Sequence, residues 1–380
     1  MNRLIIFSLT ILTPFGSCKA QTTVNKQSTY KGLPLIKAKS SQADYRIGND
    51  WVKGSWTISP QIEFDSLLIT CHAESETFAF HTDLDSIIFK LTPEQIHKFY
   101  VSINDTAYAL TVIKGIKPNF TTLQFDVASK NNNLKIWYEQ NNNNDYLNLL
   151  RSKYPIDSII KDTKTDTEKT LKILHWVHNQ WQHNGNNEPL KSDAISILEE
   201  VKEGKNFRCV EYGIVASACL NAIGLKTRTL GLKTKDVETR QSGAGHVLSE
   251  VFLNDLKKWV LIDGQWDAMP VLNGVPLNAV EFQKAIADDF KELVIRTSSS
   301  LSKNRYIDWI YPYLYYFDVS FDNREGINTD TKKINGKSKL MLVPVGAAKP
   351  TIFQITYKID NCLYTNSLND FYAPPSNIDK

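Results

Sequence analysis

Three residue types that cooperate in cysteine-dependent catalysis occur in order along the second half of this sequence: Cys209, His246 and Asp263. Cys209 follows residues 204–208 and opens a segment with the pattern of a helix, which Gly224 ends. A helix N-terminus carries partial positive charge and so stabilises a thiolate, the nucleophilic form of cysteine. An imidazole nearby would complete the activation. The sequence therefore predicts a nucleophilic thiol at Cys209.

The spacing of His246 and Asp263 predicts how these two residues meet. Residues 246–253 and 257–263 have strand patterns, and a polar turn with Asn254 and Asp255 separates them. If the turn is centred on that pair, His246 lies directly opposite Asp263, with Cβ atoms about 4.5–5.5 Å apart. Asp263 would then fix the tautomer of His246 and stabilise its imidazolium, as in a hydrolase triad. A register shift of one residue would put them on opposite faces.

The residues around these positions resemble the core of the transglutaminase-like superfamily. Residues 207–228 read FRCVEYGIVASACLNAIGLKTR, and the pattern continues with GH at 245–246, EVF at 250–252 and WVLID at 259–263. The resemblance covers residues 146–270 and implies a papain-like α+β core whose catalytic triad falls on Cys209, His246 and Asp263. It also implies attack on amides, by cross-linking, peptide hydrolysis or deglycosylation.

Two further stretches relate to the family less closely. Residues 264–267 read GQWD and depart from its pattern, which leaves the neighbouring wall of the cleft unassigned. Residues 340–354 resemble, more weakly, the tail of secreted bacterial transglutaminase-like proteins.

A thiol that attacks amides also needs hydrogen-bond donors for the developing oxyanion. The backbone N–H of Cys209 is the natural first donor. We expect the second from a side chain in residues 180–183, which precede Cys209 on a helix-to-loop segment. Gln180 and Trp181 are the candidates, although Trp181 fits a core position better.

Three histidines lie close together in the sequence, before Cys209. His175, His178 and His183 invite a metal site, but neither a carboxylate nor a cysteine completes a standard zinc pattern. We therefore expect no metal and no cofactor, and we interpret these histidines as helix surface and cleft rim.

Residues 306–317 hold seven aromatic residues, which could form a sugar- or peptide-binding wall or, as we favour, pack against the core.

The remaining cysteines have no assigned role. Cys219 shares a helix with Cys209 but not its face, so it is expected in the core. Cys71, Cys219 and Cys362 could include one disulfide in an oxidising compartment.

The pattern of the chain changes near an asparagine run at residues 141–144. Residues 28–140 contain short alternating runs, with hairpin turns predicted at 104–105 and 130–133, and are expected to form an antiparallel β-sandwich. Residues 145–375 combine helices and strands and are expected to form the catalytic domain with a C-terminal extension. Thr165 with Glu168, and Asn278 with Glu281, have the spacing of capping boxes, and the second is expected to open a helix that runs to Leu293. The predicted fold class is thus α+β.

The first twenty residues have the features of an export signal: Arg3, an apolar run at 4–12, and small residues after it. Cleavage after Ala20 would release a soluble protein, whereas residues 15–18 (FGSC) resemble a relaxed lipobox in which Cys18 is acylated. We expect a periplasmic or cell-surface lipoprotein, or a secreted protein, whose only link to a membrane is this lipid.

Composition limits the partners. The 380 residues are 42% hydrophobic and 22% charged, which is typical of a globular protein, and the net charge of +3 falls to +1 without residues 1–20. Basic and acidic residues are interspersed, so no nucleic acid is expected.

Together these features predict an exported cysteine enzyme that attacks amide or peptide bonds, by hydrolysis more than by cross-linking. Its substrate would be a protein or peptide, with cell-wall peptide or glycan as further candidates. The alternative is an inactive scaffold that binds protein or glycan at the cell surface.

Overall fold

The computed structural model describes residues 28–128, 134–139, 144–326 and 330–375. They form two compact units, and the chain passes from the first to the second between Lys117 and Pro118. The predicted export signal, with Cys18 and Ala20, lies outside the described residues. Within the described residues, the helices are all too short or too polar to cross a membrane.

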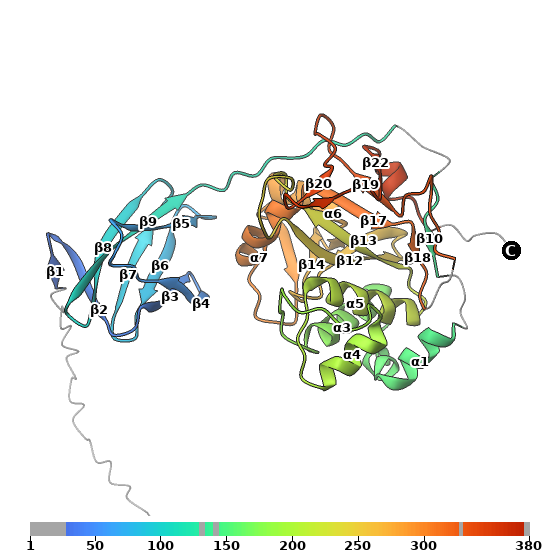
Figure 1. The fold of residues 1–380 in the computed structure, drawn as a ribbon, viewed down its shortest axis with the longest axis horizontal. Coiled ribbons are helices and arrows are strands. Elements are labelled where there is room, and N and C mark those ends of the chain that lie inside the picture. The colour runs from blue at the N-terminus through green and yellow to red at the C-terminus, as the bar shows by residue number, and fades with distance from the viewer. Residues whose placement is uncertain (1–27, 129–133, 140–143, 327–329, 376–380) are drawn as a thin grey trace, which may run out of the picture. The chain divides into compact units, whose positions relative to one another are not determined.

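The first unit is a β-sandwich (Figure 1). One sheet has the order β1 (Thr29–Tyr30), β2 (Leu33–Ala38), β8 (Ile96–Ile103), β9 (Ala107–Ile116) and β5 (Asp65–Thr70). The other has the order β4 (Asp50–Thr57), β3 (Gln42–Ile47), β6 (Glu76–His81) and β7 (Ser86–Leu91). Phe78 and Phe80 from one sheet and Phe99 from the other share a single buried core. The predicted sandwich is confirmed, although β2 with β8 and β5 with β9 pair in parallel.

The first predicted hairpin is confirmed. Strands β8 and β9 pair antiparallel, and Ile103 opposes Ala107 across the turn. Asn104 and Asp105 both have positive φ, of 52° and 56°, which these residue types tolerate better than most.

The second predicted hairpin is wrong. Within residues 134–139, β10 (Trp137–Tyr138) pairs in parallel with β18 (Asp322–Asn323), and residues 122–127 contain only a bridge from Asp126 to Ser367. The reason is burial, because Phe125 and Trp137 pack against a core of the second unit. The division between the units accordingly lies at residues 117–118 and not at the asparagine run.

A six-stranded sheet forms the centre of the second unit (Figure 1). Its order is β13 (Lys258–Ile262), β12 (Gly245–Leu253), β11 (Thr227–Lys233), β17 (Tyr316–Ser320), β19 (Lys339–Leu342) and β22 (Cys362–Thr365). Smaller pieces of sheet are β14 (Met269–Leu272) between β15 (Val275–Pro276) and β16 (Leu293–Arg296), and β20 (Ile352–Phe353) with β21 (Tyr357–Lys358). The second unit thus combines a central sheet with helices, as the predicted α+β class requires.

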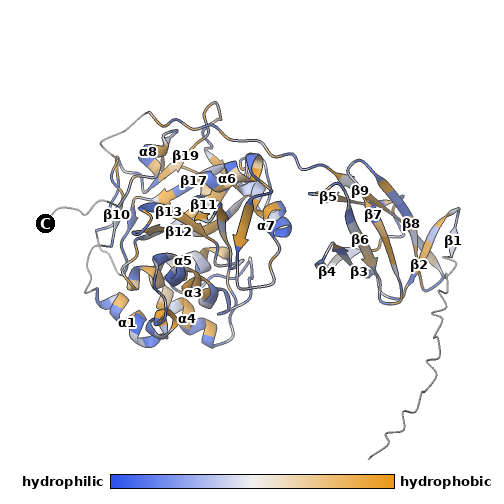
Figure 2. Cartoon of the chain, turned by 180° about the vertical axis from the view of Figure 1, so that it is seen from behind, coloured by the Kyte–Doolittle hydropathy of each residue, from blue (hydrophilic) through white to orange (hydrophobic). Residues whose placement is uncertain are grey.

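Helices cover both faces of this sheet. Those that share the first buried core are α1 (Asp145–Lys153), α2 (Ile156–Ile160), α3 (Asp166–His178), α4 (Ala194–Lys202) and α5 (Cys209–Ala222). Those of the second core are α6 (Ala279–Asp288), α7 (Lys303–Ile310), the 3₁₀ turn η1 (Tyr311–Tyr313) and α8 (Leu368–Phe371). Figure 2 shows the hydrophobic colour concentrated on the strands between these layers.

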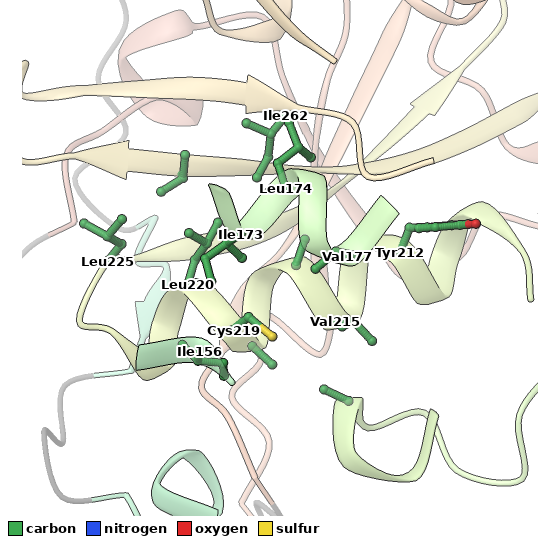
Figure 3. Packing of buried hydrophobic residues seen from close by; sticks show 14 of the residues in the cluster. Ile156, Ile173, Leu174, Val177, Tyr212, Val215, Cys219, Leu220, Leu225 and Ile262 are labelled. Carbon is green, nitrogen blue, oxygen red and sulfur yellow. The ribbon is translucent and has the colours of Figure 1, made fainter. Parts of the chain in front are cut away.

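The central helix of the first core is α5, which is buried along most of its length (Figure 3). Val215 and Cys219 of α5 pack with Leu174 of α3 and Ile262 of β13. Gly224, with φ +86°, follows the end of the helix in the left-handed conformation that glycine favours. This packing fixes α5 against the sheet, so the position of its first residue, Cys209, is also fixed.

Local sequence signals explain where the helices begin. Both predicted capping boxes are present: Thr165 with Glu168 opens α3, and Asn278 with Glu281 opens α6. The end predicted for the second of these helices is wrong. It stops at Asp288, and Leu293 instead begins β16, where its side chain is buried in the second core.

Candidate active site

Cys209 is the first residue of α5 and is half-buried. The N-terminus of this helix is held by Glu211, whose buried carboxylate accepts the backbone N–H and the guanidinium of Arg208. Burial by itself would raise the pKa of the Cys209 thiol. Hydrogen bonds with His183 and His246, the charge of His246 and the N–H of Val247 outweigh it and lower the pKa to about 6. The thiol at this position therefore exists largely as thiolate near neutral pH.

His246 lies on β12 and is buried beside Asp263, which directly follows β13. The Nε2–H of His246 donates to Oδ2 of Asp263 at 2.9 Å, which leaves Nδ1 for Cys209. Burial lowers the pKa of His246, but the charge of Asp263 and the hydrogen bonds raise it to about 9. An imidazolium paired with a thiolate is thus the stable state between these two pKa values.

The register of β12 and β13 differs from the prediction. Ser249 opposes Ile262 and Leu253 opposes Lys258, so the two strands are offset by two residues from the expected pairing. The cause is the turn, which has four residues, 254–257, and includes Lys257 at φ 52°. A shift of two residues keeps side chains on the same face, so His246 and Asp263 still meet, as diagonal neighbours.

Asp263 has further hydrogen-bond donors that the sequence did not reveal. The buried hydroxyl of Tyr306, on α7, donates to Oδ2 at 3.0 Å, and the backbone N–H of Gln265 donates to Oδ1 at 3.0 Å. Together with His246 they satisfy both carboxylate oxygens of a fully buried acid, which holds the carboxylate in one orientation.

The stretch at residues 264–267 is fixed by the elements around it. The carboxylate of Asp267, on a backbone with φ 52°, accepts Nδ1–H of His175 at 3.0 Å and the N–H of Ser298 at 2.9 Å. The Nδ1–H of His178 donates to the carbonyl of Gly264 at 3.2 Å. Two of the histidines considered for a metal thus anchor α3 to the loop that follows Asp263. Among the described residues, groups of three or more His, Cys, Asp or Glu side chains placed to bind a metal are absent.

The aromatic residues of 306–317 divide between the two interpretations. Tyr306 is buried, and Tyr316 and Phe317 are buried in strand β17, as packing requires. Trp309 and Tyr313 are only partly buried, and their ring centroids lie 4.8 Å and 6.0 Å from that of His246. Trp309 also contacts Trp266 at 4.9 Å. An aromatic surface, made of Trp266, Trp309 and Tyr313, therefore borders the histidine.

The two candidates for a side-chain oxyanion donor are not among the hydrogen-bond partners of Cys209. The amide of Gln180 donates to the carbonyl of Trp176 at 2.8 Å. Trp181 is buried, with its ring stacked on Tyr212 at 4.2 Å. The residue that reaches Cys209 from this segment is His183. The sequence places His183 at the cleft rim and does not predict this contact with the thiol.

The other described cysteines form no disulfide. The described cysteines, Cys71, Cys209, Cys219 and Cys362, are all free thiols. Cys219 is fully buried in the first core, as expected from its place on the helix (Figure 3).

A family model described as the transglutaminase-like superfamily matches residues 156–264. A transglutaminase crystal structure has 21% identity and a TM-score of 0.23 over 32% of this chain and 31% of its own. A candidate cysteine protease from Cytophaga hutchinsonii has 14% identity and a TM-score of 0.27, over 55% and 73%. Red sea bream transglutaminase has 12% identity and a TM-score of 0.24, over 56% and 44%.

This chain thus spans about a third of the length of the first of these structures. Curated protein sequences give no match. The match of the family model includes Cys209, His246 and Asp263, and it ends one residue after Asp263. The second unit therefore contains a transglutaminase-like domain, at residues 156–264.

Proposed function

We propose that this protein is a cysteine enzyme that cleaves amide or peptide bonds, with Cys209 as nucleophile, His246 as acid and base, and Asp263 as the group that orients His246. The observation that carries the proposal is the continuous chain of hydrogen bonds from Cys209 through His246 to Asp263. A thiol with its pKa lowered to about 6 beside an imidazole with its pKa raised to about 9 is the arrangement that nucleophilic catalysis by cysteine requires.

In the first half of the reaction, the Cys209 thiolate attacks the carbonyl carbon and forms a C–S bond, and the π electrons move to the oxygen. When the oxyanion collapses, the C–N bond breaks and His246 gives its proton to the departing amine. In the second half, neutral His246 takes a proton from water, which attacks the thioester and releases the acid. The C–S bond breaks, and the thiolate and imidazolium are restored.

We propose hydrolysis as the second half because water is always present, whereas acyl transfer needs a dedicated site for a second amine. The substrate would be a protein or a peptide, including peptides of the cell wall. An inactive scaffold that binds proteins or glycans would be favoured by a fully buried Cys209 or one displaced from His246, and Cys209 is neither.

The test is digestion of a peptide library by the purified protein, read by mass spectrometry, beside the Cys209→Ala variant. Cleavage by the native protein and its loss in the variant are expected. In parallel, the rate of modification by iodoacetamide against pH should have its midpoint near 6. A midpoint at 8.5 or above, together with equal digestion by Cys209→Ala, would exclude the mechanism.

We also propose that residues 1–20 direct export, and that Cys18 is either acylated or removed with the signal. The mass of the mature N-terminus, measured in cells that process such signals, separates these two outcomes. A chain that still begins at Met1 would contradict both.

A further inference from the structure

We infer that His183 is the side-chain donor that stabilises the oxyanion formed during attack by Cys209. The inference rests on the proposed function, because it assigns a second imidazole to the same reaction. The observation behind it is a contact of the thiol: His183 lies on the loop between α3 and α4, and its side chain hydrogen-bonds Cys209.

The loop around His183 is fixed to the segment that leads into α5. The backbone N–H of Gln182 donates to Oδ1 of Asn206 at 3.1 Å, and the N–H of Asn184 donates to the carbonyl of Phe207 at 2.8 Å. These two bonds lie on either side of His183 in sequence, and their acceptors lie two and three residues before Cys209. The position of His183 next to the thiol is therefore set by backbone hydrogen bonds and not by its own exposed side chain.

A third contact strengthens the same connection. The side-chain amide of Asn187 donates to the carbonyl of Asn206 at 2.8 Å. Residues 182–187 thus contact residues 206 and 207 at three points, and the loop must move together with the N-terminus of α5. A donor on such a loop is preorganised, which is the property that makes an oxyanion site effective.

The two imidazoles at Cys209 must do different work. His246 is bound through Nε2 to Asp263 and is the group that exchanges a proton with the leaving amine and with water. His246 gives up one proton in the first half-reaction and regains one in the second, so the reaction needs no second proton carrier and His183 is not required for that role. The role left for His183 is that of a hydrogen-bond donor, beside the backbone N–H of Cys209 and that of Val247, which also reaches the sulfur.

Movement of charge during the attack explains how the contact serves that purpose. In the free enzyme the negative charge is on Sγ, and a donor from His183 is hydrogen-bonded to it. When the C–S bond forms, sulfur loses this charge and the carbonyl oxygen, two bonds away, gains it. A donor held at the sulfur can then bond the oxygen after a small shift, so its interaction is stronger in the transition state than in the ground state.

The other donor candidates in residues 180–183 are less suitable. The amide of Gln180 is bonded to Trp176, and Trp181 is buried with its ring against Tyr212. His183 is therefore the side chain of residues 180–183 that hydrogen-bonds the thiol.

The test compares two reactions of the same thiol. Alkylation by iodoacetamide needs the thiolate but forms no oxyanion. Acetylation by p-nitrophenyl acetate needs the thiolate and passes through an oxyanion, and its leaving group departs without a proton from His246. Rates are measured on the plateau above the pH midpoint of each variant, so that every protein is fully thiolate.

For His183→Ala we expect acetylation to slow by about 10²-fold, the size found when one donor of an oxyanion site is removed, with the alkylation plateau unchanged. His183→Gln should restore most of the acetylation rate, because its amide also donates but carries no charge. Gln182→Ala is the matched control: its side chain is the exposed neighbour, and both rates should stay as in the native protein.

An equal fall of both rates in His183→Ala would overturn the inference and make His183 only an activator of the thiolate. Unchanged acetylation would overturn it as well, as would failure of His183→Gln to recover, since a positive charge would then be the active feature. The proposed function fails separately, if native protein gives no burst of p-nitrophenolate or if Cys209→Ala gives the same burst.

Discussion

Removing the charge of Asp263 should raise the pKa of Cys209, although the two residues have no direct hydrogen bond. In Asp263→Asn the amide oxygen can still accept from His246 and Tyr306, which leaves the NH₂ facing the N–H of Gln265. The variant therefore keeps the His246 contact, loses one hydrogen bond and loses the negative charge. Since His246 is buried, burial then dominates and its pKa falls below the ordinary 6.5.

The size of the effect follows from the two pKa values. The pKa of Cys209 lies about three units below its ordinary 9.0, which corresponds to about 4 kcal/mol in favour of the thiolate. The imidazolium supplies part of this, and His183 and the N–H of Val247 supply the rest. If Asp263→Asn makes His246 neutral, we expect the pKa of Cys209 to rise by about two units, so that the thiolate fraction at pH 7 falls about tenfold.

The assay is the rate of iodoacetamide modification from pH 5 to 9.5 for native protein, Asp263→Asn and Tyr306→Phe. Tyr306→Phe removes one hydrogen bond to the same carboxylate and keeps the charge, so its midpoint should stay near the native one. That variant should lose about 1–3 kcal/mol of folding stability instead. A midpoint near 6 in Asp263→Asn would refute the reasoning, because the charge of Asp263 would then not be what keeps His246 protonated.

Three further predictions concern pH and the loops. The rate of acylation by p-nitrophenyl acetate should rise with a midpoint near pH 6, as the Cys209 thiolate forms. Near pH 9 His246 deprotonates, and the thiolate–imidazolium pair is lost. A midpoint of the rise near 8.5 would contradict the assignment of the thiolate. Burial, with the charge of Glu139, raises the pKa of Glu325 from 4.5 to about 7. Between these two pH values the folded state retains a proton that the unfolded state loses, so folding stability falls as the pH rises from 4.5 to about 7. Glu325→Gln should therefore add about 3 kcal/mol at pH 8 and nothing at pH 4, by urea unfolding, and an equal gain at both would contradict this. Asp267→Asn keeps a residue type that tolerates positive φ, and should cost about 1–2 kcal/mol because the acceptor for three hydrogen bonds is weakened; an unchanged urea midpoint would argue against that role.

Local signals in the sequence were sufficient to predict the elements that bear the site. The helix at Cys209, its end at Gly224 and the antiparallel pair that bears His246 all follow from short-range patterns. The register was predicted wrongly because the loop length, four residues and not two, depends on the positive φ of Lys257. The contact of His246 with Asp263 nevertheless formed, since a strand offset by two residues presents the same face.

Contacts that depend on distant segments could not be predicted in this way. Tyr306 reaches Asp263 from 43 residues away, and no period in the sequence relates them. The second hairpin failed for a similar reason: alternation in residues 122–127 and 134–139 predicted pairing between them, whereas Phe125 and Trp137 pack, partly buried, against a core built from later residues. Hydrophobic alternation specifies which side chains are buried, but not which partner buries them.

The loop after Asp263 shows how a departure from a family pattern can still serve the same site. Gln265 contributes its backbone N–H to Asp263, which any residue type but proline can supply. Asp267 then fixes this loop by accepting hydrogen bonds from His175 on α3 and from Ser298, 31 residues later. The orientation of Asp263 therefore depends on the backbone position of Gln265 and on the two distant donors that the carboxylate of Asp267 binds. Replacement of His175 should consequently disturb the pH dependence of Cys209 through Asp263, although His175 contacts neither.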